Sequence, residues 1–170
     1  MEIWDLFDGN RNTLGKTHLR GVELTKGEYH VVVEIFTINA DGRILLTQRD
    51  PAKTYPLLWE ITGGSVTASE SSLQGAAREL EEETGLVAAP EQLKKIGEIK
   101  YGHYFRDSYI WKSPELIETS TMNLQPGEVC GAKLVTFEEL QEMDGLGLTV
   151  PSVLERCQLY HQDLQQMILL

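Results

Sequence analysis

The sequence predicts an α/β domain in which helices cover a mixed β-sheet. Short segments rich in β-branched residues recur along the chain, amphipathic segments with helical spacing separate them, and turn residues lie between the two kinds. Strands interleaved with helices fold into layered domains. The 170 residues suit a single domain spanning 1–170, with enough chain for a hydrophobic core.

Eight short strands are expected, because β-branched and aromatic residues cluster between turn residues. Asp41-Gly42 gives the strongest hairpin signal, and Gly and Asn residues between the first two segments indicate another turn. The expected strands are residues 2–8, 16–21, 28–38, 43–49, 56–62, 94–102, 104–111 and 132–137.

A helix is expected over residues 70–84, where apolar side chains recur at helical spacing and Gly85 follows as a C-terminal cap. A short helix is expected at 137–143. A C-terminal helix should begin at a capping box made by Ser152 and Glu155. The predicted buried face of the first helix is Leu73, Ala76, Ala77, Leu80 and Thr84, and that of the last is Val153, Cys157, Tyr160, Leu164 and Met167.

The composition argues against several partners. The net charge is -11 and no basic stripe is visible, so a nucleic-acid polymer is not expected as a partner. Apolar runs such as Val31 to Val33 are too short to span a membrane, and the first residues do not resemble a signal peptide. Cys130 and Cys157 lack metal-ligand or CxxC spacing and are interpreted as free thiols of a cytoplasmic protein.

Three acidic residues share one face of the expected helix at 70–84. Glu79, Glu82 and Glu83 lie at i, i+3 and i+4, and we expect them opposite the apolar face, pointing away from the core. Like charges at this spacing cost roughly 0.2–0.5 kcal/mol per pair, but converging carboxylates are good ligands for Mg²⁺ or Mn²⁺. Gly75, one turn earlier, leaves room for a substrate or packs against a loop.

The residues around these glutamates form a motif: Gly64, Glu70, Arg78-Glu79-Leu80, Glu82-Glu83 and Gly85-Leu86. It resembles the signature of Nudix hydrolases at every specified position. The resemblance implies a Nudix-type α/β/α sandwich and hydrolysis of a diphosphate bond by attack of water on phosphorus, with Mg²⁺ or Mn²⁺ as cofactor. It implies that Glu79, Glu82, Glu83 and the Gly64 carbonyl bind the metal. Glu70 and Arg78 would play supporting roles, with Arg78 orienting a glutamate through a charge-assisted pair.

The resemblance leaves the general base open. In many Nudix hydrolases it is a signature glutamate, which makes Glu82 the first choice here. Glu128, in the segment Pro-Gly-Glu-Val, is the candidate outside the signature, although it could also be a turn carboxylate. Asp107 comes next.

Residues 28–64 and 124–140 resemble the Nudix branch that includes type I isopentenyl diphosphate isomerases and their hydrolase relatives. In those isomerases a basic pair binds the substrate diphosphate, so Arg49 and Lys53 are candidate diphosphate contacts, or ordinary surface charges. The isomerases also need a cysteine beside the glycines before the signature, and the segment from Ile61 to Gly64 has none. His18 and His30 lack the spacing of isomerase metal ligands and are interpreted as structural.

The leading hypothesis is a divalent-metal-dependent hydrolase of a nucleoside diphosphate derivative or another organic diphosphate. An isomerase of isopentenyl diphosphate and a non-catalytic nucleotide-sensing domain are the alternatives. The expected partner is a small-molecule diphosphate, and the resemblance leaves a homodimer open. An aromatic cluster could stack a base, form a dimer contact or simply belong to a strand: Tyr101, His103, Tyr104 and Phe105.

Overall fold

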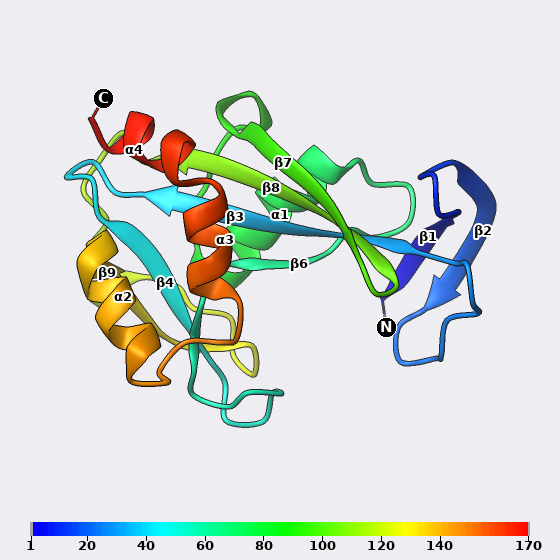
Figure 1. The fold of residues 1–170 in the computed structure, drawn as a ribbon, viewed down its shortest axis with the longest axis horizontal. Coiled ribbons are helices and arrows are strands. Elements are labelled where there is room, and N and C mark those ends of the chain that lie inside the picture. The colour runs from blue at the N-terminus through cyan, green and yellow to red at the C-terminus, as the bar shows by residue number, and fades with distance from the viewer. Residues whose placement is uncertain (1, 170) are drawn as a thin grey trace.

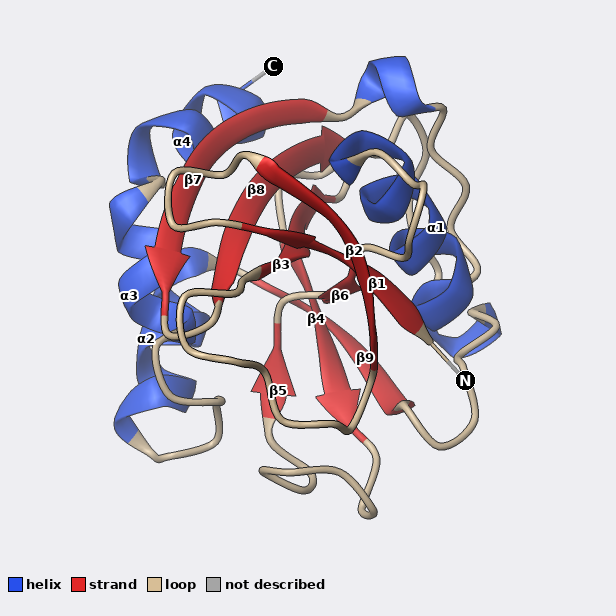
Figure 2. Cartoon of the chain, turned by 90° about the vertical axis from the view of Figure 1, so that its right-hand side faces the viewer, coloured by secondary structure: helices blue, strands red, loops and turns tan. Residues whose placement is uncertain are grey.

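The computed structural model describes residues 2–169, which fold into three layers (Figures 1 and 2). A seven-stranded mixed sheet forms the middle layer, with strand order β5-β4-β3-β8-β7, while β6 pairs with β3 and β9 with β4. Helix α1 (Ser72–Thr84) covers one face, and α2 (Phe137–Gly145), α3 (Val153–Leu159) and α4 (His161–Leu169) cover the other. The strands are β3 (His30–Ile38), β4 (Ile44–Arg49), β5 (Trp59–Glu60), β6 (Gly63–Ser65), β7 (Lys94–Tyr101), β8 (Tyr104–Lys112) and β9 (Val129–Val135).

Strand β3 connects the two hydrophobic cores, because its successive side chains point to opposite faces of the sheet. Val31, Val33 and Ile35 pack in the core beneath α1. Phe36 and Ile38 belong to the core shared with α2, α3 and α4. The expected α/β sandwich is therefore confirmed, with the sheet buried on both faces.

An N-terminal hairpin forms a separate two-stranded sheet from β1 (Ile3–Phe7) and β2 (Thr13–Leu19). Figure 1 shows it beside one end of the main sheet. Hydrogen bonds between the backbones of Phe7 and Tyr29 join it to the chain before β3. The Trp4 ring stacks on His30 at a centroid distance of 4.0 Å and on His18 at 6.2 Å, in keeping with the structural interpretation of both histidines.

The first predicted helix is correct apart from its start. Helix α1 begins at Ser72 rather than at residue 70, because Ser71 and Gln74 form the capping box that opens it. Gly85 ends it in the left-handed region with φ 74°, as predicted.

The predicted capping box at Ser152 and Glu155 is wrong. Ser152 has φ 73° and its side chain caps no backbone N–H, accepting instead a hydrogen bond from Arg156 at 2.5 Å. The predicted C-terminal helix is also interrupted at Tyr160, which separates α3 from α4. Most of its predicted apolar face is nevertheless buried: Val153, Cys157, Tyr160 and Leu164.

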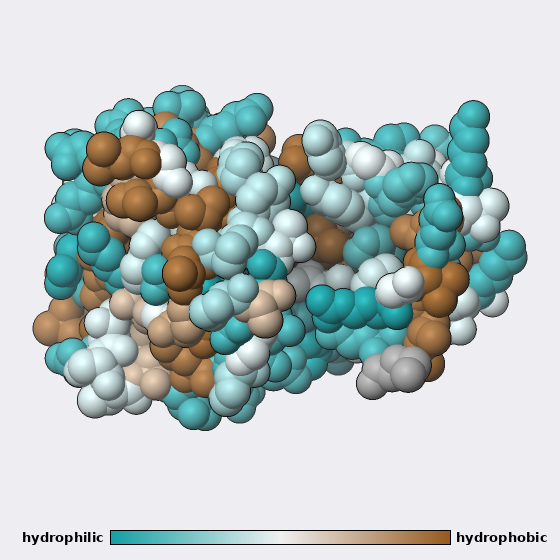
Figure 3. Space-filling view, turned by 90° about the horizontal axis from the view of Figure 1, so that it is seen from below, coloured by the Kyte–Doolittle hydropathy of each residue, from teal (hydrophilic) through white to brown (hydrophobic). Residues whose placement is uncertain are grey.

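The surface mixes apolar and polar side chains on the face shown in Figure 3. A hollow in this face separates the larger body from the part that carries the N-terminal residues. None of the helices within residues 2–169 is long and apolar enough to cross a membrane.

Candidate active site

The position of the site follows from how the strands next to β3 are arranged. Strand β3 pairs with β4 only at Ile38 and Ile44, whereas near its start it pairs with β6. The other end of β4 pairs with β5, and β9 pairs with β4 along its length. A cavity of about 250 Å³, here called the glutamate pocket, is lined by Glu2, Arg20, Arg49, Lys53, Gly63, Gly64, Ser65, Glu79, Glu82, Glu83, Gln125 and Glu128.

Two glycines allow α1 to approach the sheet at this pocket. A Cβ added to Gly63 would overlap the backbone carbonyl oxygen of Val33, and one added to Gly64 would overlap the carboxylate of Glu79. Any side chain at these positions would push β6 away from β3 or displace Glu79. The motif therefore needs glycine for steric reasons.

The acidic face of α1 was expected to point away from the core, and this expectation is wrong for two of its three glutamates. Glu79 and Glu83 are 7% and 4% exposed, while Glu82 is exposed. They are buried because this flank of the helix faces β6, where the glycines leave space, and the Gly63 N–H donates a hydrogen bond to Glu83 at 3.3 Å. Burial, followed by repulsion from Glu60 and Glu79, raises the pKa of Glu83 to about 8.

Arg78 connects the acidic groups of the motif. Its guanidinium donates two hydrogen bonds of 2.9 Å to Glu70 and one of 2.9 Å each to Glu79, Glu82 and the Ser65 carbonyl. Burial also raises the pKa of Glu79, and the charge of Arg78 opposes this effect. Arg78 thus fixes two of the predicted metal ligands and ties the helix to β6.

The donor chemistry of the pocket suits a divalent cation, because several carboxylates lie around one cavity and two of them are buried. Within residues 2–169, however, no three His, Cys, Asp or Glu side chains are close enough together to form a complete ligand set. Arg78 binds the carboxylates of Glu79 and Glu82 instead. The glutamates fit a metal ion provided that Glu82 exchanges Arg78 for it.

The basic residues predicted to contact a diphosphate do reach this pocket. Arg49 forms an ion pair with Glu60 at 2.7 Å, and Lys53 pairs with Glu128. The loop containing Lys53 is joined to the segment of Glu128 by a backbone hydrogen bond of 2.9 Å from Asp50 N–H to the Glu128 carbonyl. The predicted phosphate contact and the predicted outside base are therefore direct partners.

Sequence reasoning missed Glu60. It lies on the two-residue strand β5, and burial raises its pKa while the pairing with Arg49 opposes the rise. The signature begins only at Gly64, so it gives no weight to this position. Glu60 lines a neighbouring cavity, whereas Glu2, Arg20 and Gln125 line the glutamate pocket itself without a signal in the sequence.

Asp107, the third candidate base, lies outside the glutamate pocket, and its position gives no support to that role. Its side chain is fully buried, forms ion pairs with Arg11 at 2.5 Å and Lys95 at 2.8 Å, and accepts a hydrogen bond from Ser72. Although burial acts to raise its pKa, these donors hold that pKa below its usual value. Asp107 does not line the glutamate pocket.

Gly75 leaves no room for a substrate. A Cβ there would come within 3.1 Å of Val66 and 3.2 Å of Glu70, so close packing explains the residue.

The residues of the predicted aromatic cluster differ in their exposure to solvent. Tyr101 is 68% exposed, whereas Phe105 is 4% exposed and packs in the core beneath α1.

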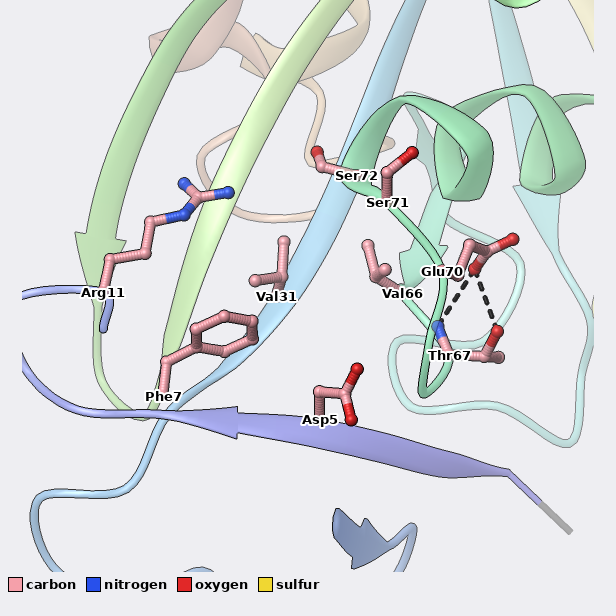
Figure 4. A pocket seen from close by; sticks show the side chains of 9 residues that line it. All are labelled: Asp5, Phe7, Arg11, Val31, Val66, Thr67, Glu70, Ser71 and Ser72. Atoms are coloured by element: carbon pink, nitrogen blue, oxygen red, sulfur yellow. Dashed lines mark hydrogen bonds between the residues drawn. The ribbon is translucent and has the colours of Figure 1, made fainter. Parts of the chain in front are cut away.

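A separate cavity of about 310 Å³ lies between the N-terminal hairpin and the start of α1 (Figure 4). Phe7 and Val31 supply apolar walls, and Glu70 accepts hydrogen bonds from Thr67 at its rim. The predicted metal ligands on α1 do not line it. The glutamate pocket is therefore the candidate active site.

Comparisons with known proteins agree with this geometry. A NUDIX domain model matches residues 28–154. An uncharacterised Nudix hydrolase of Listeria monocytogenes is 34% identical over 155 residues, covering 89% of this chain and 89% of that protein. An isopentenyl-diphosphate Delta-isomerase of Streptomyces avermitilis is 31% identical over 108 residues, covering 62% of this chain and 54% of that enzyme.

Among solved structures, the chain resembles a protein from Deinococcus radiodurans with a TM-score of 0.74 at 21% identity, covering 92% of this chain and 98% of that one. This likeness shows the fold. The domain match covers most of the sheet, the glycine-rich strand β6 and all of α1. With a domain match over most of its length and relatives that are Nudix hydrolases, the chain belongs to the Nudix family and is a hydrolase.

Proposed function

We propose that this protein uses Mg²⁺ or Mn²⁺ to hydrolyse a phosphoanhydride bond in a nucleoside diphosphate derivative or another organic diphosphate, by attack of water on phosphorus. One observation carries the proposal: buried glutamates of α1 share a cavity with Arg49 and Lys53, which lie about thirty residues earlier in the sequence. A cavity with both carboxylates and cations suits a metal-bound diphosphate better than either free metal or free anion.

In this proposal Glu79, Glu82 and Glu83 bind the metal together with the Gly64 carbonyl. Carboxylate and carbonyl oxygens are the ligands that Mg²⁺ and Mn²⁺ prefer. A bound divalent cation neutralises phosphate charge and lowers the pKa of a water molecule. It also compensates the burial of Glu79 and Glu83, carboxylates that are otherwise opposed by the charges of Arg78 and Lys53, respectively.

Arg49 and Lys53 bind the diphosphate. Arg49 is held by Glu60 and by the Thr54 carbonyl at 2.5 Å, so its guanidinium is fixed at the cavity wall before substrate arrives. Lys53 is paired with Glu128 and must exchange that carboxylate for a phosphate oxygen. This exchange leaves Glu128 without its cation at the moment when substrate is bound.

Two residues can then remove a proton from the attacking water, Glu82 and Glu128. Glu82 is exposed at the cavity and becomes available when its ion pair with Arg78 breaks. Glu128 becomes available when its ion pair with Lys53 breaks. Loss of a general base typically lowers kcat by about 10²–10⁴-fold. Measuring kcat of Glu82→Gln and Glu128→Gln at saturating metal shows which residue is the base. Activity lost with a metal ligand is partly restored by more metal, whereas activity lost with the base is not.

The experiment that tests the function is turnover of a panel of diphosphates with Mg²⁺ or Mn²⁺. It includes nucleoside diphosphates, nucleotide sugars and dinucleotides, with phosphate or nucleotide release as the readout. We expect release that depends on the metal and is lost in Glu83→Gln. Folded protein that releases nothing from any panel member would contradict the proposal, and deuterium incorporation into isopentenyl diphosphate would favour the isomerase instead.

The cysteines fit a cytoplasmic setting for this hydrolase. Cys130 is exposed and Cys157 is buried, and both are free. Burial raises the pKa of Cys157 to about 12, which keeps it an inert thiol. Free thiols are typical of reducing compartments.

A further inference from the structure

A second pocket adjoins the glutamate pocket and shares its wall. This cavity of about 260 Å³, here called the Arg106 pocket, is lined by Gly63, Gly64 and Ser65, which also line the glutamate pocket. Residues of β3 and β8, together with Glu60, Ile61 and Arg156 from α3, complete it. A diphosphate held by the glutamates would therefore have the rest of its molecule within reach of the Arg106 pocket.

Most charges in the Arg106 pocket are already neutralised. Arg156 forms an ion pair with Glu34 at 2.6 Å, and Glu34 also accepts a hydrogen bond from Ser108 at 2.7 Å. Glu60 is paired with Arg49 at 2.7 Å. Each glutamate of the pocket thus has an arginine of its own.

Arg106 differs from these residues. Within residues 2–169 no carboxylate lies within ion-pair distance of its guanidinium, although the chain carries a net charge of -11. Its single side-chain hydrogen bond runs to the Tyr104 hydroxyl at 3.0 Å, and the guanidinium lies 5.3 Å from the centre of the Tyr104 ring. A guanidinium has five N–H donors, so most of them are available to a ligand.

The backbone fixes Arg106 at this wall. Residues two apart on a strand point to the same face, so Tyr104 and Arg106 lie side by side on β8. In the parallel pairing with β3 they stand opposite His30 and Val32. Tyr104 holds the guanidinium in a half-buried position, which strengthens its interaction with an anion relative to open solvent.

We propose that Arg106 binds a second anionic group, a phosphate or a carboxylate, on the organic part of the diphosphate substrate. The inference rests on the proposed function, because the diphosphate positions the molecule for this contact. The planar guanidinium suits both anions through paired hydrogen bonds. Arginine and glutamate side chains in the pocket also make it unsuited to a hydrocarbon chain such as a prenyl group.

Matched substrate pairs test the proposal, because their members differ in the second anion. NADPH and NADH differ in one ribose phosphate, coenzyme A and dephospho-coenzyme A in another, and UDP-glucuronate and UDP-glucose in a carboxylate. We expect kcat/KM to favour the anionic member of at least one pair by about ten-fold or more, the size of one charge-assisted hydrogen bond. The pair that responds identifies the anion as phosphate or carboxylate.

Variants show whether Arg106 causes the preference for the substrate with the second anion. Arg106→Gln should abolish it while leaving kcat/KM for the member without the second anion unchanged, and Arg106→Lys should restore part of it. Arg43→Gln removes the same charge from an exposed ion pair with Asp41 on the hairpin before β4 and should leave the preference intact.

Three results would overturn the inference. The first is wild-type protein that hydrolyses these diphosphates without preference in any pair. The second is an Arg106→Gln variant that loses activity equally on both members, since Arg106 would then bind the shared diphosphate. If no diphosphate is hydrolysed, the proposed function fails, and the inference is then tested by calorimetry. Adenosine 2′,5′-bisphosphate is compared with adenosine 5′-monophosphate, and UDP-glucuronate with UDP-glucose. The third contradicting result is equal affinity for the two members of both pairs.

Discussion

The Glu83 carboxylate accepts a hydrogen bond from the backbone N–H of Gly63, 3.3 Å away, and thereby joins the end of α1 to β6, the strand in which the signature begins. Twenty residues of chain separate the two groups. The contact places a nearly buried carboxylate at the wall of the glutamate pocket, where Gly63 can have no side chain.

Glu83→Gln should abolish activity without lowering stability. Glutamine keeps the size of the side chain and can accept the Gly63 hydrogen bond, and it is neutral like the protonated carboxyl that burial favours. We expect turnover to fall by about 100-fold or more, as for loss of one preorganised group in an active site. Metal-dependent phosphate release and the thermal midpoint, measured on the same sample, check both parts. Glu81→Gln, at an exposed position of α1, is the matched control.

The two glycines of β6 should respond differently to alanine. Gly63→Ala sets a methyl group against the Val33 carbonyl, which belongs to the central strand and cannot move alone, so stability should fall by about 1–3 kcal/mol. Gly64→Ala meets the Glu79 carboxylate, which can rotate, so activity should fall more than stability. Gly145→Ala, with nothing within 4 Å of the added methyl group, is the control. Urea unfolding and turnover measure the two effects, and equal losses of stability in all three variants would contradict the assignment.

The sequence predicted most of what is local. Periodicity and turn residues identified α1 and its glycine cap, and the spacing of the motif identified the residues around Arg78. These features depend on neighbours within a few turns of the same helix. Ser152 shows the limit, because the φ of a residue entering a helix depends on how the preceding loop packs.

What depends on packing between distant segments could not be predicted. Helical spacing alone placed Glu83 on a solvent face, but the divergence of β4 from β3 and the absence of side chains on β6 bury it. The pairing of Lys53 with Glu128 joins residues 75 positions apart. Glu60 could not be recognised before the two-residue strand β5 was seen to place it against Arg49, which lines the glutamate pocket.

Lys53→Gln should weaken substrate binding more than it slows the chemical step. The lysine contacts the diphosphate in our proposal and leaves the reacting water alone, so KM should rise while kcat changes little. Steady-state kinetics against the best substrate of the panel measure both constants. A variant with wild-type KM and a strongly reduced kcat would show that Lys53 acts on the reaction itself, and Lys26→Gln at an exposed loop position controls for the lost charge.

His30 should make the fold sensitive to acid. Its ring is 8% exposed against Trp4, and burial lowers its pKa from 6.5 to about 4. Between these values the unfolded chain binds a proton that the folded chain does not. The contribution of His30 to the free energy of unfolding should therefore fall by about 1.4 kcal/mol per pH unit as the pH drops from 6.5 toward 4, and level off below that. Glu83, with its pKa raised to about 8, contributes in the opposite direction, so the effect of His30 is read from the difference between variants.

Substitution His30→Phe tests this origin of the acid sensitivity. Phenylalanine keeps a ring against Trp4 and cannot take up a proton, and the His30 Nδ1 that it removes has no hydrogen-bond partner among the described residues. In urea unfolding, the change in stability from pH 7 to pH 4 should then be less unfavourable in His30→Phe than in the wild type. His103→Gln, at an exposed histidine, should keep the wild-type slope. If the slope in His30→Phe equals that of the wild type, protonation of His30 does not cause the loss; the ion pairs of Asp107 weaken only at lower pH, because they hold the pKa of that carboxylate below 3.8.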